Sequence, residues 1–173
     1  RRIAETHPDV RFVVDEAFAD FVGDRCSLAP ARPENVVLLC SMTKFYAVPG
    51  LRLGYAVAAE PVAARLRELV PPWSVNALAQ AVGAAVLADD QYAERTRRVV
   101  AELRQSLSGN LRAVPGLTVF PGEANFLLVR LDGAHLDAPA LAARLLQRRI
   151  AIRVCDNYEG LDRRYFRVAV RTE

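Results

Sequence analysis

The sequence predicts an α/β fold, in which a mostly parallel sheet flanked by helices is followed by a small α+β domain at the carboxyl end. Residues 10–14 (VRFVV) and 35–40 (NVVLLC) form nearly continuous apolar runs, which are typical of strands buried on both faces. After residue 108 the pattern changes to short strand-like runs around one helix. We therefore expect a large domain over 1–107, ending in a long interdomain helix, and a small domain over 108–173.

Three strands are expected in the large domain. The run 10–14 ends at Asp15 and the run 35–40 ends at Ser41, as buried strands of a parallel sheet do. A third strand, 51–58, is expected after the turn signal of a Pro-Gly pair.

Three helices are expected after these strands. The first spans 60–69, with Pro61 in its first turn, where a missing N–H costs little. A second, alanine-rich helix is expected over about 75–89, with Ser74 as its N-cap. The third spans 92–107 and has charges along one side.

The small domain is expected to contain four strands and one helix. The helix, 137–148, separates the second strand from the third. The strands are 117–120, 125–131, 150–154 and 165–170.

The composition argues against several classes of function. With 173 residues, of which 52% are hydrophobic, the chain is long enough to bury a core, so disorder is not expected. Its 23 Lys and Arg residues are scattered rather than gathered into a stripe, which argues against a nucleic-acid partner. The longest weakly polar stretch, 77–88, is too short to cross a bilayer, so no membrane span is expected.

The cysteines and histidines favour a cytoplasmic protein without a metal site. Cys26, Cys40 and Cys155 are odd in number and far apart, which suits reduced thiols. Neither histidine has a second ligand at metal-binding spacing. No signal peptide is expected, and because Met42 is the sole methionine we expect the chain to be a piece of a longer one.

Lys44 and Asp15 are the residues best suited to carry chemistry. Lys44 follows the run 35–40, and Asp15 closes the strand before it, so both side chains would emerge at the carboxyl edge of a parallel sheet, where α/β folds bind ligands. A lysine whose amine can lose its proton is a nucleophile toward carbonyl carbon. Taken singly, the two residues also fit plain roles, as a surface lysine and a helix-capping aspartate.

Three motifs together resemble the pyridoxal-phosphate site of fold type I enzymes. They are DEAF (15–18), SMTK (41–44) and GLRLGY (50–55), in this order and spacing. Phe18 departs from the pattern, because many such enzymes have a tyrosine there whose hydroxyl contacts the cofactor ring. The resemblance implies that the chain is part of the large domain of a fold type I transferase.

The same resemblance implies a role for each matching residue. Lys44 would hold pyridoxal 5'-phosphate as a Schiff base, and Asp15 would pair with the pyridinium nitrogen. Ser41 and Arg52 would bind the cofactor phosphate, since a guanidinium can donate two parallel hydrogen bonds to it. Ala17 is small, as a residue under the ring should be.

Beyond the cofactor motifs, the chain is similar to the threonine-phosphate decarboxylases, which lie beside the histidinol-phosphate aminotransferases. The likeness rests on VPPWSVNALAQAVGAAVL, FPGEANFLLVRL and LLQRRIAIRVCDNYEGLDRRYFRVAVRT, and spans nearly the whole chain. It implies a homodimeric carboxy-lyase that converts L-threonine O-3-phosphate to (R)-1-amino-2-propanol O-2-phosphate for cobalamin biosynthesis. Arg167 would bind the substrate carboxylate and Arg153 the substrate phosphate.

Two other interpretations remain open. An aminotransferase of the histidinol-phosphate type could use the same residues, because the outcome depends on which bond of the substrate is held out of the plane of the ring. A noncatalytic remnant that keeps the fold is the second. The resemblance also places further cofactor contacts outside these 173 residues, so the chain alone is expected to bind the cofactor weakly or not at all.

Overall fold

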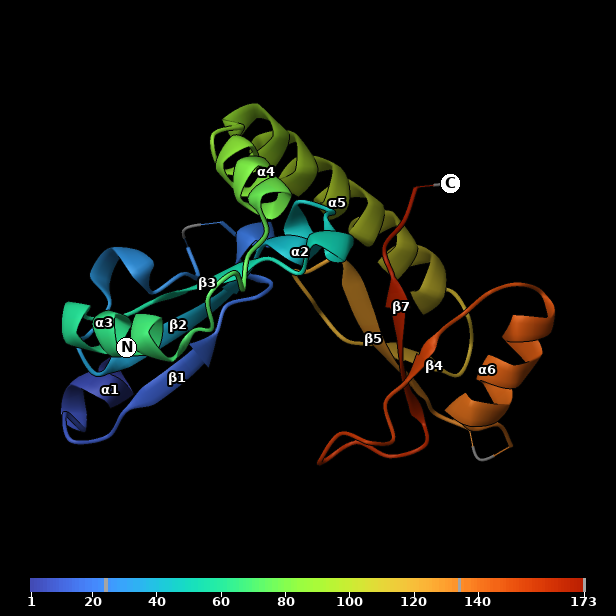
Figure 1. Ribbon diagram of the computed structural model, residues 1–173. Helices are drawn as coiled ribbons and strands as arrows, with labels where there is room; N and C mark the ends of the chain where they lie inside the picture. Colours follow the sequence, from blue (N-terminus) through green and yellow to red (C-terminus); the bar gives the residue numbers. More distant parts are fainter. Residues whose placement is uncertain (24, 134, 173) are drawn as a thin grey trace. The chain divides into compact units, whose positions relative to one another are not determined.

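Two compact units, Arg1–Arg97 and Arg98–Glu173, make up the protein in a computed structural model that describes residues 1–23, 25–133 and 135–172 (Figure 1). The division falls within one long helix, α5 (Asp90–Arg112). No helix among the described residues is both long and apolar enough to span a membrane.

The first unit contains a three-stranded sheet in the order β1-β2-β3. β1 (Phe12–Asp15) and β2 (Val36–Ser41) are parallel, whereas β3 (Gly54–Val57) runs antiparallel to β2. Residues 42–53 connect the two strands, and Ser41 at the end of β2 pairs with Gly54 at the start of β3.

The two faces of this sheet differ. Val36 and Leu38 are buried on one face, with Ala4 from the first helix, and Phe12 and Val14 pack against them. On the other face Val13 is 62% exposed and Leu39 is 44% exposed. Helices and 3-10 turns complete the unit: α1 (Arg2–Thr6), η1 (Ala19–Phe21), η2 (Ala29–Ala31), α2 (Met42–Phe45), η3 (Pro49–Leu51), α3 (Glu60–Leu69) and α4 (Ala77–Leu87).

Besides the remainder of α5, the second unit contains an antiparallel sheet in the order β4-β5-β7-β6 and a further helix. Its strands are β4 (Leu117–Val119), β5 (Phe126–Leu131), β6 (Arg153–Val154) and β7 (Tyr165–Ala169). The helix, α6 (Ala138–Gln147), begins at an Asp137 N-cap. The centre of the core of the second unit is formed by Leu127, Val129 and Phe166. The partly buried Leu107 and Leu111 of α5 pack against this core.

The helix predicted over 60–69 is confirmed, but the predicted N-cap of the next helix is wrong. α4 begins at Ala77, and its N-cap is Asn76, whose Oδ1 accepts a hydrogen bond from the Ala79 N–H at 2.9 Å. Ser74 lies before the start of the helix, in a turn in which its N–H donates a hydrogen bond to the Pro71 carbonyl at 3.3 Å.

The third predicted strand, 51–58, is shorter than expected. It begins only at Gly54, because Pro49–Leu51 forms a 3-10 turn and Arg52 then adopts a left-handed conformation with φ 51°. The third predicted helix, 92–107, is in turn longer, since α5 continues through Gly109 to Arg112.

Candidate active site

Asp15 and Ser41 lie at the same edge of the first sheet. They are the last residues of β1 and β2, and these strands are parallel, with Asp15 opposite Leu39 in the register. α2 (Met42–Phe45), which contains Lys44, follows directly after the last residue of β2 (Figure 1). The chain therefore brings a carboxylate, a hydroxyl and an amine to the carboxyl ends of two parallel strands, the usual place for ligands in open α/β sheets.

A hydrogen-bonded row links Ser41 to Lys44. Ser41 Oγ lies 2.8 Å from Thr43 Oγ1, and Lys44 Nζ donates to the same Thr43 oxygen at 3.0 Å. Thr43 is buried and Lys44 is exposed, so the row runs from the interior to the surface. Sequence reasoning assigned no role to Thr43, although a hydroxyl next to the lysine in SMTK is a visible signal.

Asp15 and Ala17 form a tight turn directly after β1. Asp15 Oδ1 accepts a hydrogen bond from the Ala17 N–H at 2.8 Å, which leaves the second carboxylate oxygen for another partner. The carboxylate is exposed.

Arg52 lies close to this edge through backbone contacts. The Leu53 carbonyl accepts a hydrogen bond from the Met42 N–H at 3.1 Å, and Gly54 is the cross-strand partner of Ser41. Gly54 has to be glycine, because a Cβ there would come within 2.6 Å of the Cys40 carbonyl oxygen. The Arg52 guanidinium donates one hydrogen bond, from Nη1 to the Pro49 carbonyl at 3.2 Å, and is otherwise exposed.

These donors and charges fit a small anionic aldehyde with a basic ring. Within the described parts of the chain, none of Asp15, Lys44 and Arg52 forms an ion pair, so their charges are uncommitted. A hydroxyl and a guanidinium suit a phosphate, an amine suits a carbonyl carbon and a carboxylate suits a protonated ring nitrogen. The donor set therefore matches the pyridoxal phosphate that the sequence motifs imply.

The second unit brings Arg153 and Arg167 together. They are direct cross-strand partners on β6 and β7, a placement in which two like charges repel. The Arg167 guanidinium lies 3.8 Å above the Phe126 ring, and its Nε is buried with no hydrogen-bond partner among the described residues. Arg153 donates to Asn157 Oδ1 at 3.0 Å. Because an unsatisfied buried donor and a like-charge pair are both costly, an anion bound here would relieve them.

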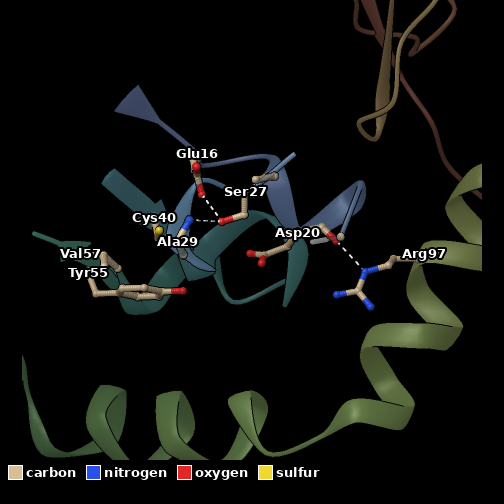
Figure 2. A pocket seen from close by; sticks show the side chains of 10 residues that line it. Glu16, Asp20, Ser27, Ala29, Cys40, Tyr55, Val57 and Arg97 are labelled. Atoms are coloured by element: carbon tan, nitrogen blue, oxygen red, sulfur yellow. Dashed lines mark hydrogen bonds between the residues drawn. The ribbon is translucent and has the colours of Figure 1, made fainter. Parts of the chain in front are cut away.

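A polar cavity of about 200 Å³ lies in the first unit on the face of the sheet opposite Asp15 (Figure 2). Tyr55 and Asp20 point their polar ends into it, beside Cys40. Burial raises the pKa of each of these groups above its ordinary value. Glu16, 8% exposed, is already satisfied by Ser27 Oγ and the Leu28 N–H, each at 2.8 Å.

This cavity was not found by sequence reasoning, because its residues come from separate segments with no shared motif. Arg97 reaches it from α5 and donates through Nε to the Asp20 carbonyl at 2.9 Å (Figure 2). Neither Lys44 nor Asp15 lines this cavity, so it is separate from the candidate site at the sheet edge.

Comparisons with known proteins agree on the architecture. A family model described as aminotransferase class I and II matches residues 1–173. Threonine-phosphate decarboxylase of Salmonella typhimurium is 44% identical over 95% of this chain and 45% of its own length. The crystal structure of L-threonine-O-3-phosphate decarboxylase from Porphyromonas gingivalis has a TM-score of 0.87 and 28% identity, over 99% of this chain and 53% of that one.

An aminotransferase structure has a slightly higher TM-score. That of histidinol-phosphate aminotransferase from Clostridium acetobutylicum gives a TM-score of 0.92 and 30% identity, over 99% of this chain and 52% of that one. The chain thus spans about half the length of the proteins it matches.

Proposed function

The chain belongs to the aminotransferase class I and II family, and on that premise we propose that the whole protein decarboxylates L-threonine O-3-phosphate to (R)-1-amino-2-propanol O-2-phosphate. The observation that carries the proposal is the 44% identity to a threonine-phosphate decarboxylase over 95% of the chain. Pyridoxal 5'-phosphate is the cofactor of the family. When bound, its protonated ring accepts the electron pair that remains on the substrate α-carbon as the carboxyl group departs.

Four residues of the first unit would hold the cofactor. Lys44 Nζ would bind its aldehyde carbon, and the Asp15 carboxylate would keep the ring nitrogen protonated. Ser41 Oγ and the Arg52 guanidinium would bind the phosphate, and the small Ala17 side chain would leave room for the ring. Lys44, when it is not bound to the cofactor and its amine is protonated, would be the group that could donate a proton to the substrate α-carbon.

Two residues of the second unit would bind the substrate. Arg167 has a buried Nε, without a hydrogen-bond partner in the described part of the chain, that would suit a carboxylate, and its cross-strand neighbour Arg153 would supply a second cation for the phosphate. The way these two residues orient the substrate would decide which of its bonds reacts. We further propose that the protein works as a homodimer, like other members of the family.

The second candidate is an aminotransferase of the histidinol-phosphate type. The TM-score of 0.92 to the Clostridium acetobutylicum aminotransferase favours it. Histidinol phosphate has a phosphate but no carboxylate, so in this case the arginine pair would bind the phosphate alone.

Product analysis separates the two candidates. The whole protein, loaded with pyridoxal phosphate and given L-threonine O-3-phosphate without an oxo acid, is expected to release one carbon dioxide per aminopropanol phosphate formed. Lys44→Ala should abolish this release. Glutamate formation that requires 2-oxoglutarate and histidinol phosphate, without carbon dioxide, would contradict the decarboxylase and support the aminotransferase.

A further inference from the structure

Lys44 lies on α2, a helix that is too short to be stable by itself. α2 has only four residues, and helices this short are unstable without tertiary contacts. Its last residue, Phe45, is 2% exposed and lies within an aromatic cluster of Phe21, Phe45, Tyr46 and Tyr92. The Phe21 and Phe45 ring centroids are 5.1 Å apart and those of Phe45 and Tyr92 are 6.2 Å apart, both edge to face. The cluster therefore fixes the helix that carries the amine.

Tyr92 also donates a hydrogen bond to the last carbonyl group of α2. The last carbonyl groups of a helix have no partner within it. The Lys44 carbonyl accepts from the Ala47 N–H at 3.3 Å, and the Phe45 carbonyl accepts from the Tyr92 hydroxyl at 3.2 Å. Tyr92 lies 47 positions further along the chain, at the start of α5, so this contact is tertiary.

Arg97 adds a second contact from the same helix. Its guanidinium carbon lies 5.5 Å from the centroid of the Phe45 ring, while its Nε donates to the Asp20 carbonyl. The first turns of α5 thus contact both the segment that follows Asp15 and the segment that contains Lys44.

We propose that Tyr92 is a positioning residue for Lys44. Its hydroxyl fixes the carbonyl end of α2, and its ring fixes Phe45, so that Lys44 Nζ is presented in the orientation seen in the bond to Thr43 Oγ1. This inference rests on the proposed function, in which Lys44 holds the cofactor.

The rate of cofactor attachment tests it. In the whole protein freed of cofactor, Lys44 Nζ condenses with the aldehyde of added pyridoxal phosphate, forming a C=N bond and releasing one water, with a visible absorption band. Tyr92→Phe keeps the ring and removes one hydrogen bond, which typically changes an equilibrium about three- to tenfold. We therefore expect attachment to slow, and the dissociation constant to rise, about three- to tenfold.

Tyr46→Phe is the matched control. It removes a phenol hydroxyl from the same cluster, one for which no hydrogen bond is found among the described residues, and should leave both values within about twofold of the parent protein. Equal losses in Tyr46→Phe and Tyr92→Phe would overturn the role of the Tyr92 hydroxyl. So would an unfolded Tyr92→Phe protein, because the proposed effect is local.

Lys44→Ala distinguishes a failure of the positioning role of Tyr92 from a failure of the proposed function of Lys44. Borohydride reduction followed by peptide mass analysis locates the attached cofactor. If Lys44→Ala abolishes attachment while Tyr92→Phe behaves as the parent, only the positioning role fails. If attachment survives Lys44→Ala, the proposed function itself fails.

Discussion

Arg167 combines features that are costly without a ligand. Its Nε is buried and has no hydrogen-bond partner in residues 1–23, 25–133 and 135–172, its guanidinium lies over the Phe126 ring, and Arg153 is its partner on the neighbouring strand. Such a residue is pre-organised for an anion, because the ring contact holds the planar donor in place before binding.

A conservative change at Arg167 should therefore impair substrate binding. Arg167→Lys keeps the charge but loses the buried Nε donor and the planar contact with Phe126. We expect KM for the amino-acid substrate to rise about tenfold or more, the value of one charge-assisted hydrogen bond. Steady-state kinetics of the whole protein measures this. Arg171→Lys, at an exposed position, should leave KM unchanged, and an equal rise there would refute the assignment.

At the scale of the element, the start of α4 depends on one side chain. Asn76 Oδ1 accepts the Ala79 N–H, so Asn76→Ala removes the N-cap and should lower the free energy of unfolding by about 1 kcal/mol. Ser74→Ala should change it by less than about 0.5 kcal/mol. Urea denaturation of the two variants compares them directly, and a larger loss at Ser74 would mean that the helix begins earlier.

The start of α6 is sensitive to acid. The pKa of Asp137 lies below its ordinary value of 3.8, first because its carboxylate accepts the Ala140 N–H and then because Arg163 donates to it. A carboxyl with a depressed pKa in the folded state stabilises the fold above its ordinary pKa, and this contribution is lost as the pH falls through the depressed value.

Asp137→Asn should therefore make the Tm depend less on pH in acid. An asparagine still caps the helix but has no charge to lose, so its Tm should fall less than that of the parent protein as the pH drops below about 4. Thermal unfolding across that range measures the difference. Asp156→Asn, an exposed carboxyl without a hydrogen bond among the described residues, is the control and should follow the parent curve.

Elements with a strong local signal were predictable, and elements held by distant contacts were not. Pro61 marked the start of α3, which spans the predicted 60–69. The helix α2 has no periodicity because it is four residues long, and its anchor Tyr92 lies far along the chain. The motif around Lys44 indicated which residues to examine, but the pairing of Arg153 with Arg167 depends on strand register, which the sequence does not reveal.

For the molecule as a whole, the exposure of the site predicts weak cofactor binding by the chain alone. Asp15, Lys44 and Arg52 are all exposed, beside a sheet face where Val13 is 62% exposed. Small-molecule sites normally bury 70–90% of their ligand, so these residues provide only part of an enclosure. The chain spans 45% of the Salmonella decarboxylase, which leaves room in the whole protein for the remainder.

Titration with pyridoxal phosphate tests this expectation. Residues 1–173 by themselves should give little or no visible band, and Lys44→Ala should not change the result. A strong band that responds to substrate would show that the chain is a sufficient site. The whole protein, titrated under the same conditions, is the positive control.

Arg52 has a consequence for protein engineering. Its φ of 51° suits glycine, and an arginine there is strained by about 1 kcal/mol. A selection for thermal stability alone would thus favour Arg52→Gly, which would remove the strain together with the guanidinium that we propose binds the cofactor phosphate. Each stabilised variant of the protein should therefore be tested for binding of pyridoxal phosphate as well as for its Tm.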